Sequence, residues 1–227
     1  MVNVNDVPEP HEIPKDIIGA IFDKQKLLMQ KYKDIEKMPN DIVTGKDTNV
    51  DTPEGQRWVK DFAWRTTEEL CEALEAKNLA YAKMKEKYKD AIKENFTAMK
   101  DTDLDLEVKK LDEYYHYLEE CVDALHFLTE LCIIAGYNSA DFNVPINYNA
   151  REMDCVYRLG LAMNCLKNKP WKQTQMLTDR PKFKKYIQQA YARLLGLFLT
   201  SGYTMDDVFI LYFKKNAVNQ FRQRSKY

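Results

Sequence analysis

The chain has 227 residues, of which 45% are hydrophobic and 30% are charged, enough apolar material for a folded core. Lys and Arg number 34 against 35 Asp and Glu, and this net charge of −1 excludes the strongly basic field of a general nucleic-acid or anionic-membrane binder. Only 7 Gly and 8 Pro are present, too few for the many tight turns of a β-sandwich or barrel, so an all-α fold is favoured.

Two features bear on where the protein resides. No apolar stretch approaches the ~20 residues of a membrane span, and residues 1–16 lack the basic and apolar regions of a signal peptide. We therefore expect a cytoplasmic protein without a membrane or nucleic-acid partner. The 5 cysteines are odd in number and show no C-x-x-C spacing, so we expect reduced, buried thiols, and neither a zinc site nor a disulfide framework.

Helical patterns follow one another along the chain, and we expect an antiparallel or orthogonal bundle of about five to seven helices in a single domain, 1–227. The first helix opens at Pro14 and should end near Pro39. Residues 41–51 are polar and unpatterned, which predicts a loop. A second helix starts near Thr52-Pro53, and 58–99 reads as a long amphipathic helix, with or without a break.

The central helix is the most regular element. Its apolar residues recur every seven positions until Gly136 stops the helix: Leu111, Leu118, Leu125 and Cys132. A loop is predicted over Tyr137–Tyr148, followed by helices over about 150–167 and from Pro181 to about Thr200. Thr204 and Asp207 form a capping-box pattern for the last helix, from Met205 to about Gln223.

Two pairs of acidic residues stand out, each at positions i and i+3. Glu69 pairs with Glu72 on the second helix, and Glu120 pairs with Asp123 on the central helix. With about 3.6 residues per turn, the members of each pair project to the same side of their helix. If the two helices pack together, four carboxylates converge, and their repulsion calls for a counter-charge. Mg²⁺ supplies it and shares its oxygen ligands with substrate phosphates, so the pattern indicates a phosphoanhydride substrate.

A simpler interpretation competes with this one. Pairs of acids at this spacing usually form solvated helix faces, and Thr66 with Glu69 fits a capping box. Glu120 and Asp123, however, lie beside the apolar stripe and not opposite it, which favours the metal site. His126, one turn after Asp123, is predicted to orient a carboxylate, to line a base pocket, or to be a packed core histidine.

The motifs resemble those of a known family. The segment Glu68-Glu69-x-x-Glu72 looks like the signature of the all-α nucleoside triphosphate pyrophosphohydrolases, and 121–127 is similar to the second metal motif of dimeric dUTPases. Residues 212–223 resemble that family's closing K-N-x-x-N-x-x-R-Q motif. The resemblance spans most of 64–223. It implies a homodimer that uses two or more Mg²⁺ ions to hydrolyse dUTP to dUMP and pyrophosphate, with dUDP as a further candidate substrate.

The resemblance also implies roles for single residues. The metal ligands and catalytic acids match Glu69, Glu72, Glu120 and Asp123, with Glu69 or Glu72 as general base. The substrate-binding candidates are Gln25 at the base edge, Trp64 and Phe127 as stacking partners, His126, Lys167, Trp171, Lys215, Asn216, Asn219 and Arg222. From the residues alone, a core position is favoured over base stacking for Trp64 and Phe127, Gln25 is equally well explained as an exposed helical residue, and the basic residues are explained as solvated helix ends.

The sequence departs from the family's pattern in several places. Residues 73–119 are longer and more charged than expected, which predicts a charged helical excursion at about 77–110, and the chain ends in Lys226-Tyr227 where Gly-Tyr is usual. The Asn expected shortly after Gln25 is replaced by Leu28 or Met29. A dCTP-preferring or broad-specificity pyrophosphohydrolase therefore stays as an alternative. From another class, a non-catalytic helical interaction protein would use the same acids and lysines as solvated faces.

Overall fold

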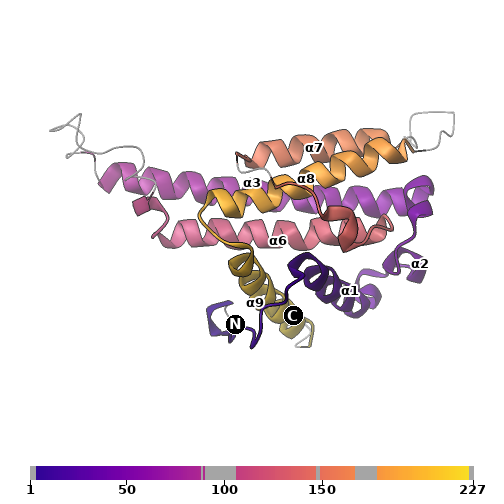
Figure 1. Ribbon diagram of the computed structural model, residues 1–227, viewed down its shortest axis with the longest axis horizontal. Coiled ribbons are helices and arrows are strands. Elements are labelled where there is room, and N and C mark those ends of the chain that lie inside the picture. Colours follow the sequence, from indigo (N-terminus) through magenta and orange to yellow (C-terminus); the bar gives the residue numbers. More distant parts are fainter. Residues whose placement is uncertain (1–3, 88, 90–105, 147–148, 167–177, 225–227) are drawn as a thin grey trace.

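The computed structural model describes residues 4–87, 89, 106–146, 149–166 and 178–224. Within these ranges the chain is helical and contains no strand, which confirms the all-α prediction (Figure 1). Nearly all of its buried apolar side chains form one continuous cluster, to which all the long helices contribute.

Two long helices form the centre of the fold. Helix α3 (Pro53–Lys87) packs most extensively against α6 (Asp112–Ile134). They run antiparallel, because Arg65 lies over the ring of Phe127 while Lys77, further along α3, lies over the ring of the earlier Tyr117. Leu118, Leu125 and Cys132 of the apolar stripe predicted for the central helix are buried, and Leu111 at its start is half-buried.

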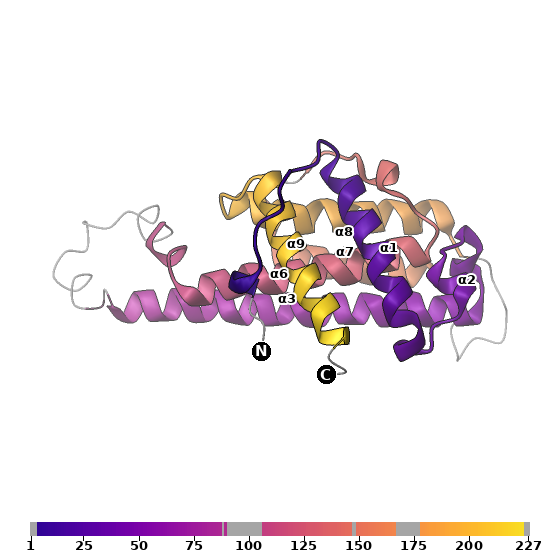
Figure 2. The ribbon, with the colours of Figure 1, turned by 90° about the horizontal axis from the view of Figure 1, so that it is seen from below.

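Two further pairs of helices cover this central pair. Helices α7 (Glu152–Cys165) and α8 (Arg180–Thr200) pack against each other on one side of it (Figure 1). Helices α1 (Ile17–Glu36) and α9 (Met205–Arg224) lie next to each other and cross the central pair on another side (Figure 2). The chain turns by 104° between α8 and α9, so the bundle contains both antiparallel and steeply crossed packing.

Local hydrogen bonds begin three of these helices at or near the predicted positions, although α1 begins at Ile17 and not at the predicted Pro14. The Asp16 side chain accepts a hydrogen bond from Gly19 N at the start of α1, and the Thr52 hydroxyl accepts one from Gly55 N at the start of α3. Helix α9 opens with the expected reciprocal capping box, in which Thr204 N donates to the Asp207 carboxylate and Asp207 N donates to the Thr204 hydroxyl.

The region predicted as a loop after the first helix is partly helical. It contains α2 (Asn40–Val43) and the 3₁₀ helix η2 (Asp47–Asp51), and Asn49 Nδ2 donates to Ile134 O at the end of α6. The segment is too short for helical periodicity to show in the sequence, and its polar side chains satisfy the end of another helix. Short 3₁₀ helices also occur at η1 (Val4–Asp6) and, inside the predicted second loop, at η3 (Ser139–Phe142).

Thr66 and Cys71 differ from their predictions, and much of the predicted charged excursion lies outside the described residues. Thr66 does not cap a helix, because it lies inside α3 and its hydroxyl donates to Phe62 O. Cys71 is exposed, whereas the other four cysteines are buried, and all five are free thiols. The predicted charged excursion is described only at its ends, as the continuation of α3 to Lys87 and the residues from 106 onward.

Among the described residues, no single helix combines the length and apolar composition of a membrane span, although the bent pair formed by α8 and 205–222 of α9 meets both conditions together.

Candidate functional site

Three of the four predicted metal-ligand carboxylates converge. Helix α3 contributes Glu69 and Glu72, helix α6 contributes Glu120, and one carboxylate oxygen from each lies within 4.8 Å of the others. The i, i+3 spacing points the two α3 acids to the side on which α6 packs. Glu120 is buried at 8% exposure, Glu69 is half-buried and Glu72 is exposed, so the cluster opens from the interhelical contact toward solvent.

The fourth predicted ligand lies beside this cluster with a different partner. Asp123, one turn after Glu120, acts electrostatically on Glu69 and is affected by Glu120. Its Oδ2 lies 2.7 Å from Lys215 Nζ, which α9 brings to the site. The site is therefore built from three helices that are far apart along the chain.

The cluster is electrostatically unfavourable as it stands. Burial, a hydrogen bond with Glu120 and the charges of the neighbouring acids raise the pKa of Glu69 to about 8. Burial also raises the pKa of Asp123 to about 6, even though Lys215 acts in the opposite direction. A hard divalent cation would favour the ionised carboxylates, and an all-oxygen donor set suits Mg²⁺. Glu69, Glu72 and Glu120 could thus hold a metal ion together.

A histidine that the sequence analysis did not select lies at the edge of this cluster. His116 Nδ1 is 3.2 Å from Glu120 Oε1 and 3.8 Å from Glu119 Oε2. His116 stands four residues before Glu120 on α6, so the helical spacing could have identified it.

The residue proposed to read the base edge lies in the protein interior. Gln25 is only 1% exposed, so it is not the exposed helical residue of the alternative interpretation. Its Oε1 lies 2.7 Å from His126 Nδ1 and accepts a hydrogen bond from the Tyr212 hydroxyl. The His126 ring stacks on Tyr212 at 4.1 Å between centroids, and burial, with the charge of Lys215, lowers the pKa of His126 to about 3. The imidazole is therefore neutral.

A further acid adjoins this group and was also missed. Gln25 forms a hydrogen bond with Glu130, and burial, together with the charge of Glu36, raises the pKa of Glu130 to about 8. Glu130 interrupts an apolar run of α6, and an acid at such a position is the signal that could have identified it. Glu130, Gln25, His126 and Tyr212 thus form a buried polar chain beside the acidic cluster.

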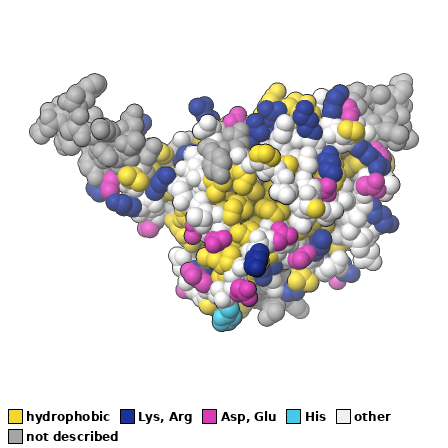
Figure 3. Space-filling model, in the orientation of Figure 1, with side chains coloured by type: hydrophobic (Ala, Val, Ile, Leu, Met, Phe, Trp, Pro, Cys, Tyr) yellow, Lys and Arg dark blue, Asp and Glu magenta, His cyan; other side chains and the backbone are white. Residues whose placement is uncertain are grey.

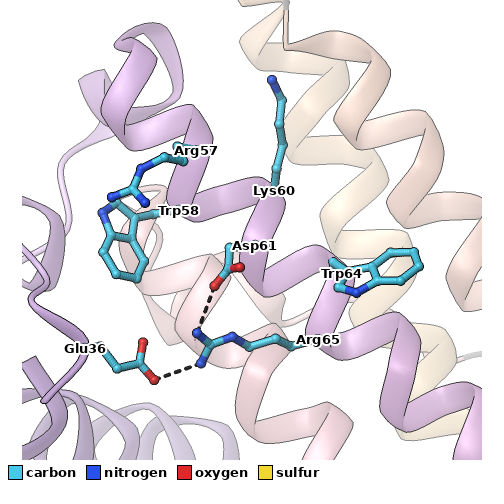
Figure 4. Close-up of a pocket in the computed structure, with 7 residues that line it drawn as sticks. All are labelled: Glu36, Arg57, Trp58, Lys60, Asp61, Trp64 and Arg65. Atoms are coloured by element: carbon cyan, nitrogen blue, oxygen red, sulfur yellow. Dashed lines mark hydrogen bonds and ion pairs between the residues drawn. The ribbon is translucent and has the colours of Figure 1, made fainter.

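The two proposed stacking residues have different surroundings. Trp64 is 62% exposed, so it is not a core residue, and it lines a pocket of about 480 Å³ (Figure 4). In the same pocket Arg65 bridges Glu36 and Asp61, and the Trp64 indole points away from these ion pairs. Phe127 is half-buried, 6.1 Å from the Phe62 ring between centroids.

The substrate-binding candidates of the C-terminal motif, residues 212–223, differ in their exposure to solvent. Asn216 is buried and its Oδ1 accepts a hydrogen bond from Gln220 Nε2, while Asn219 is half-buried. Arg222 is exposed and acts electrostatically on Asp123. The predictions for Lys167 and Trp171 fall outside the described residues.

Comparison with known proteins yields one relationship. A protein-family model described as dUTPase matches residues 107–227. These residues include Glu120, Asp123 and Lys215, whereas Glu69 and Glu72 lie before them and join the site through the packing of α3 on α6. Searches among curated proteins and among solved structures each find no match.

Proposed function

The chain belongs to the dimeric dUTPase family, and we propose that it hydrolyses dUTP to dUMP with release of pyrophosphate in a reaction that requires Mg²⁺. Membership of the family implies hydrolysis of dUTP or dUDP. The observation that carries the proposal for this chain is the convergence of Glu69, Glu72 and Glu120 beside Asp123. In a cell, this activity would limit incorporation of uracil into DNA.

The acidic cluster supports metal-dependent chemistry over a solvated helix face. Carboxylates on a solvated face would spread apart, whereas here burial and mutual repulsion disfavour their ionised forms. In the proposed enzyme, Glu69, Glu72, Glu120 and Asp123 hold two or more Mg²⁺ ions. When bound, Mg²⁺ neutralises charge on the triphosphate and lowers the pKa of a coordinated water.

The chain's own residues would then complete the reaction. Glu69 or Glu72 accepts the proton of the attacking water, since both carboxylates face the cluster. Lys215 and Arg222, together with Lys167, bind the phosphates and stabilise the negative charge that develops on them. Asn216 and Asn219 contact the deoxyribose and phosphates, and Trp171 is a further candidate for substrate binding.

The buried polar chain supports a preference for uracil. Because His126 Nδ1 faces the Gln25 carbonyl oxygen, the neutral ring carries its proton on Nδ1 and leaves Nε2 as an acceptor. That nitrogen is buried and has no hydrogen-bond partner among the described residues. An acceptor complements the N3–H of uracil and not the N3 lone pair of cytosine. Gln25 therefore acts by fixing the His126 tautomer, with Phe127 and Trp64 as candidates for contact with the base.

We further propose that the protein is a homodimer. Several large apolar side chains remain exposed on α3 and α7: Trp64, Leu79, Met153 and Tyr157. Figure 3 also shows hydrophobic side chains gathered near the middle of one face of the molecule. Burial of such surface against a second copy would be favourable.

Pyrophosphate release from a panel of deoxynucleoside triphosphates in Mg²⁺ tests the proposed reaction. We expect kcat/KM for dUTP to exceed that for dCTP by at least ~100-fold, because an unmatched hydrogen bond in a buried site is strongly unfavourable. Glu120→Gln preserves the side-chain volume but removes a ligand charge, and it should lower kcat/KM for dUTP by ~100-fold or more. Glu75→Gln, which removes one charge from an exposed position of α3, is the matched control and should retain wild-type turnover.

Each outcome separates the alternatives. Equal turnover of dUTP and dCTP would reject the uracil preference and favour a broad-specificity enzyme. Full activity of Glu120→Gln would reject its assignment as a ligand. Absence of turnover with every nucleotide would favour the non-catalytic helical interaction protein.

A further inference from the structure

The ion pair between Lys215 and Asp123 joins two residues that are expected to serve different ligands. Lys215 Nζ lies 2.7 Å from Asp123 Oδ2, and the two side chains are only 11% and 19% exposed. The pair forms across the contact between α9 and α6. An ion pair this shielded from water is screened much less than a surface pair, so separating it has an appreciable energetic cost.

The surroundings of Lys215 are predominantly acidic. Besides Asp123, the charges of Glu119 and Glu120 stabilise the lysine's protonated form and, against the effect of burial, raise its pKa. Glu69 and Glu72 complete the acidic cluster on the α3 side. The lysine ammonium thus provides positive charge at the edge of the cluster where a divalent cation would also be attracted.

We propose that Lys215 is the internal counter-ion of the metal-free site, which competes with Mg²⁺ for Asp123 and moves to the nucleotide phosphates when metal binds. This inference rests on the proposed function and concerns how the site distinguishes free Mg²⁺ from Mg²⁺ bound to a nucleotide. Mg²⁺ and Lys215 repel each other if both contact Asp123, so coordination of Mg²⁺ by Asp123 favours opening of the ion pair.

The change of partner by Lys215 predicts that Mg²⁺ binds with different affinities in the absence and in the presence of nucleotide. Free Mg²⁺ gains Asp123 but leaves Lys215 without its partner, and a buried cation without a partner is unfavourable. A triphosphate that enters with Mg²⁺ supplies a new anionic partner for the lysine. The wild-type site should therefore bind Mg²⁺ weakly by itself and strongly together with nucleotide.

Isothermal titration of Mg²⁺ into nucleotide-free protein at about pH 8, where carboxylates with ordinary pKa values are ionised, tests this inference. The variant Lys215→Met keeps an aliphatic side chain but removes the competing charge, so its Kd for Mg²⁺ should fall by about tenfold. Its KM for dUTP should rise, because the phosphate contact is lost. A residue with a merely structural role would not tighten metal binding when replaced.

The neighbouring lysine provides a matched control. The Lys214 ammonium lies 3.5 Å from the Glu9 carboxylate, and within the described part of the chain it forms no ion pair with the acidic cluster. Lys214→Met changes the net charge by the same amount as Lys215→Met. It should leave the Kd for Mg²⁺ within about twofold of the wild-type value. Lys215→Arg retains the positive charge and should keep the weak wild-type affinity. Lys215→Gln carries the same test should the Met variant fail to fold.

The outcomes distinguish this inference from the proposed function beneath it. Mg²⁺ binding by wild type with an equal or weaker affinity in Lys215→Met would overturn the counter-ion role and leave the metal site intact. Lack of Mg²⁺ binding by wild type and by every variant, with or without dUTP, would overturn both.

Discussion

At the scale of single residues, burial dominates the chemistry of this protein. Glu69 and Glu130 both lose hydration in the packed interior, and both have a raised pKa for that primary reason. Glu69 has other acids nearby and opens toward solvent, which suits a metal ligand. Glu130 is held by Gln25 within the core, close to Glu36 and Arg65, and lies further along α6 from the metal-ligand candidates.

Glu130 should make folding stability depend on pH. Its pKa is about 8 in the folded protein against an ordinary value of 4.5, so between these values the folded state retains a proton that the unfolded chain releases. Stability should consequently fall as pH rises from about 4.5 to about 8. Glu130→Gln removes this dependence, and we expect the variant's stability relative to wild type to rise by about 4 kcal/mol between pH 4.5 and pH 8.

Urea denaturation of both proteins in metal-free buffer across this pH range measures the effect. The other acids, including Glu36 and the metal-ligand candidates, are common to both proteins and cancel in the comparison. Two stability curves that stay parallel from pH 4.5 to 8 would contradict the assignment of a raised pKa to Glu130.

At the scale of helices and connections, close backbone contacts fix where elements end. Gly136 terminates α6 with a φ of 78°, and an added Cβ there would lie 2.3 Å from Asp47 N. Glycine is required for two reasons. A residue with a Cβ would be strained in this left-handed backbone conformation, and its side chain would also collide with η2. The end of α6 and the segment after α1 thus depend on each other.

The variant Gly136→Ala should therefore lower the free energy of unfolding by roughly 2 to 3 kcal/mol. Gly160 provides the control, because it lies inside α7 and an added Cβ would meet nothing within 4 Å. Gly160→Ala should raise stability by up to about 1 kcal/mol through its helix propensity. Chemical denaturation measures both, and a neutral Gly136→Ala would show that α6 does not need glycine at its end.

At the scale of the whole molecule, the site depends on how the central pair of helices meets the two helices that cross it. The antiparallel packing of α3 and α6 brings the two acidic pairs together, and the crossing helices α1 and α9 add the buried polar chain and Lys215 (Figure 2). Variants that loosen the contact of α9 with α6 should accordingly affect metal binding and phosphate binding together.

The proposed homodimer is a prediction at this scale. Sedimentation equilibrium should report about twice the chain mass of 26.7 kDa, since the exposed apolar side chains of α3 and α7 gain stability from burial against a second copy. A mass that stays at one chain across micromolar concentrations would contradict the homodimer and would leave the proposed chemistry of the site untouched.

The amino-acid sequence by itself determined the all-α class, the long helices and the pairing of acids within each motif. These features depend on periodicity, capping residues and the scarcity of Gly and Pro, which act over one or a few helical turns. Even the correct side of α6 could be assigned for Glu120 and Asp123 from the adjoining apolar stripe.

Only the tertiary structure decided which distant groups meet. Nothing local predicts that Lys215 pairs with Asp123, that Gln25 is enclosed with His126 and Glu130, or that Trp64 remains exposed. Such contacts depend on which helix faces are buried together, and the loss of water there sets both the pKa values and the partners of the polar groups. The segment after α1 likewise became helical because it packs on the end of α6, a contact that its short pattern could not encode.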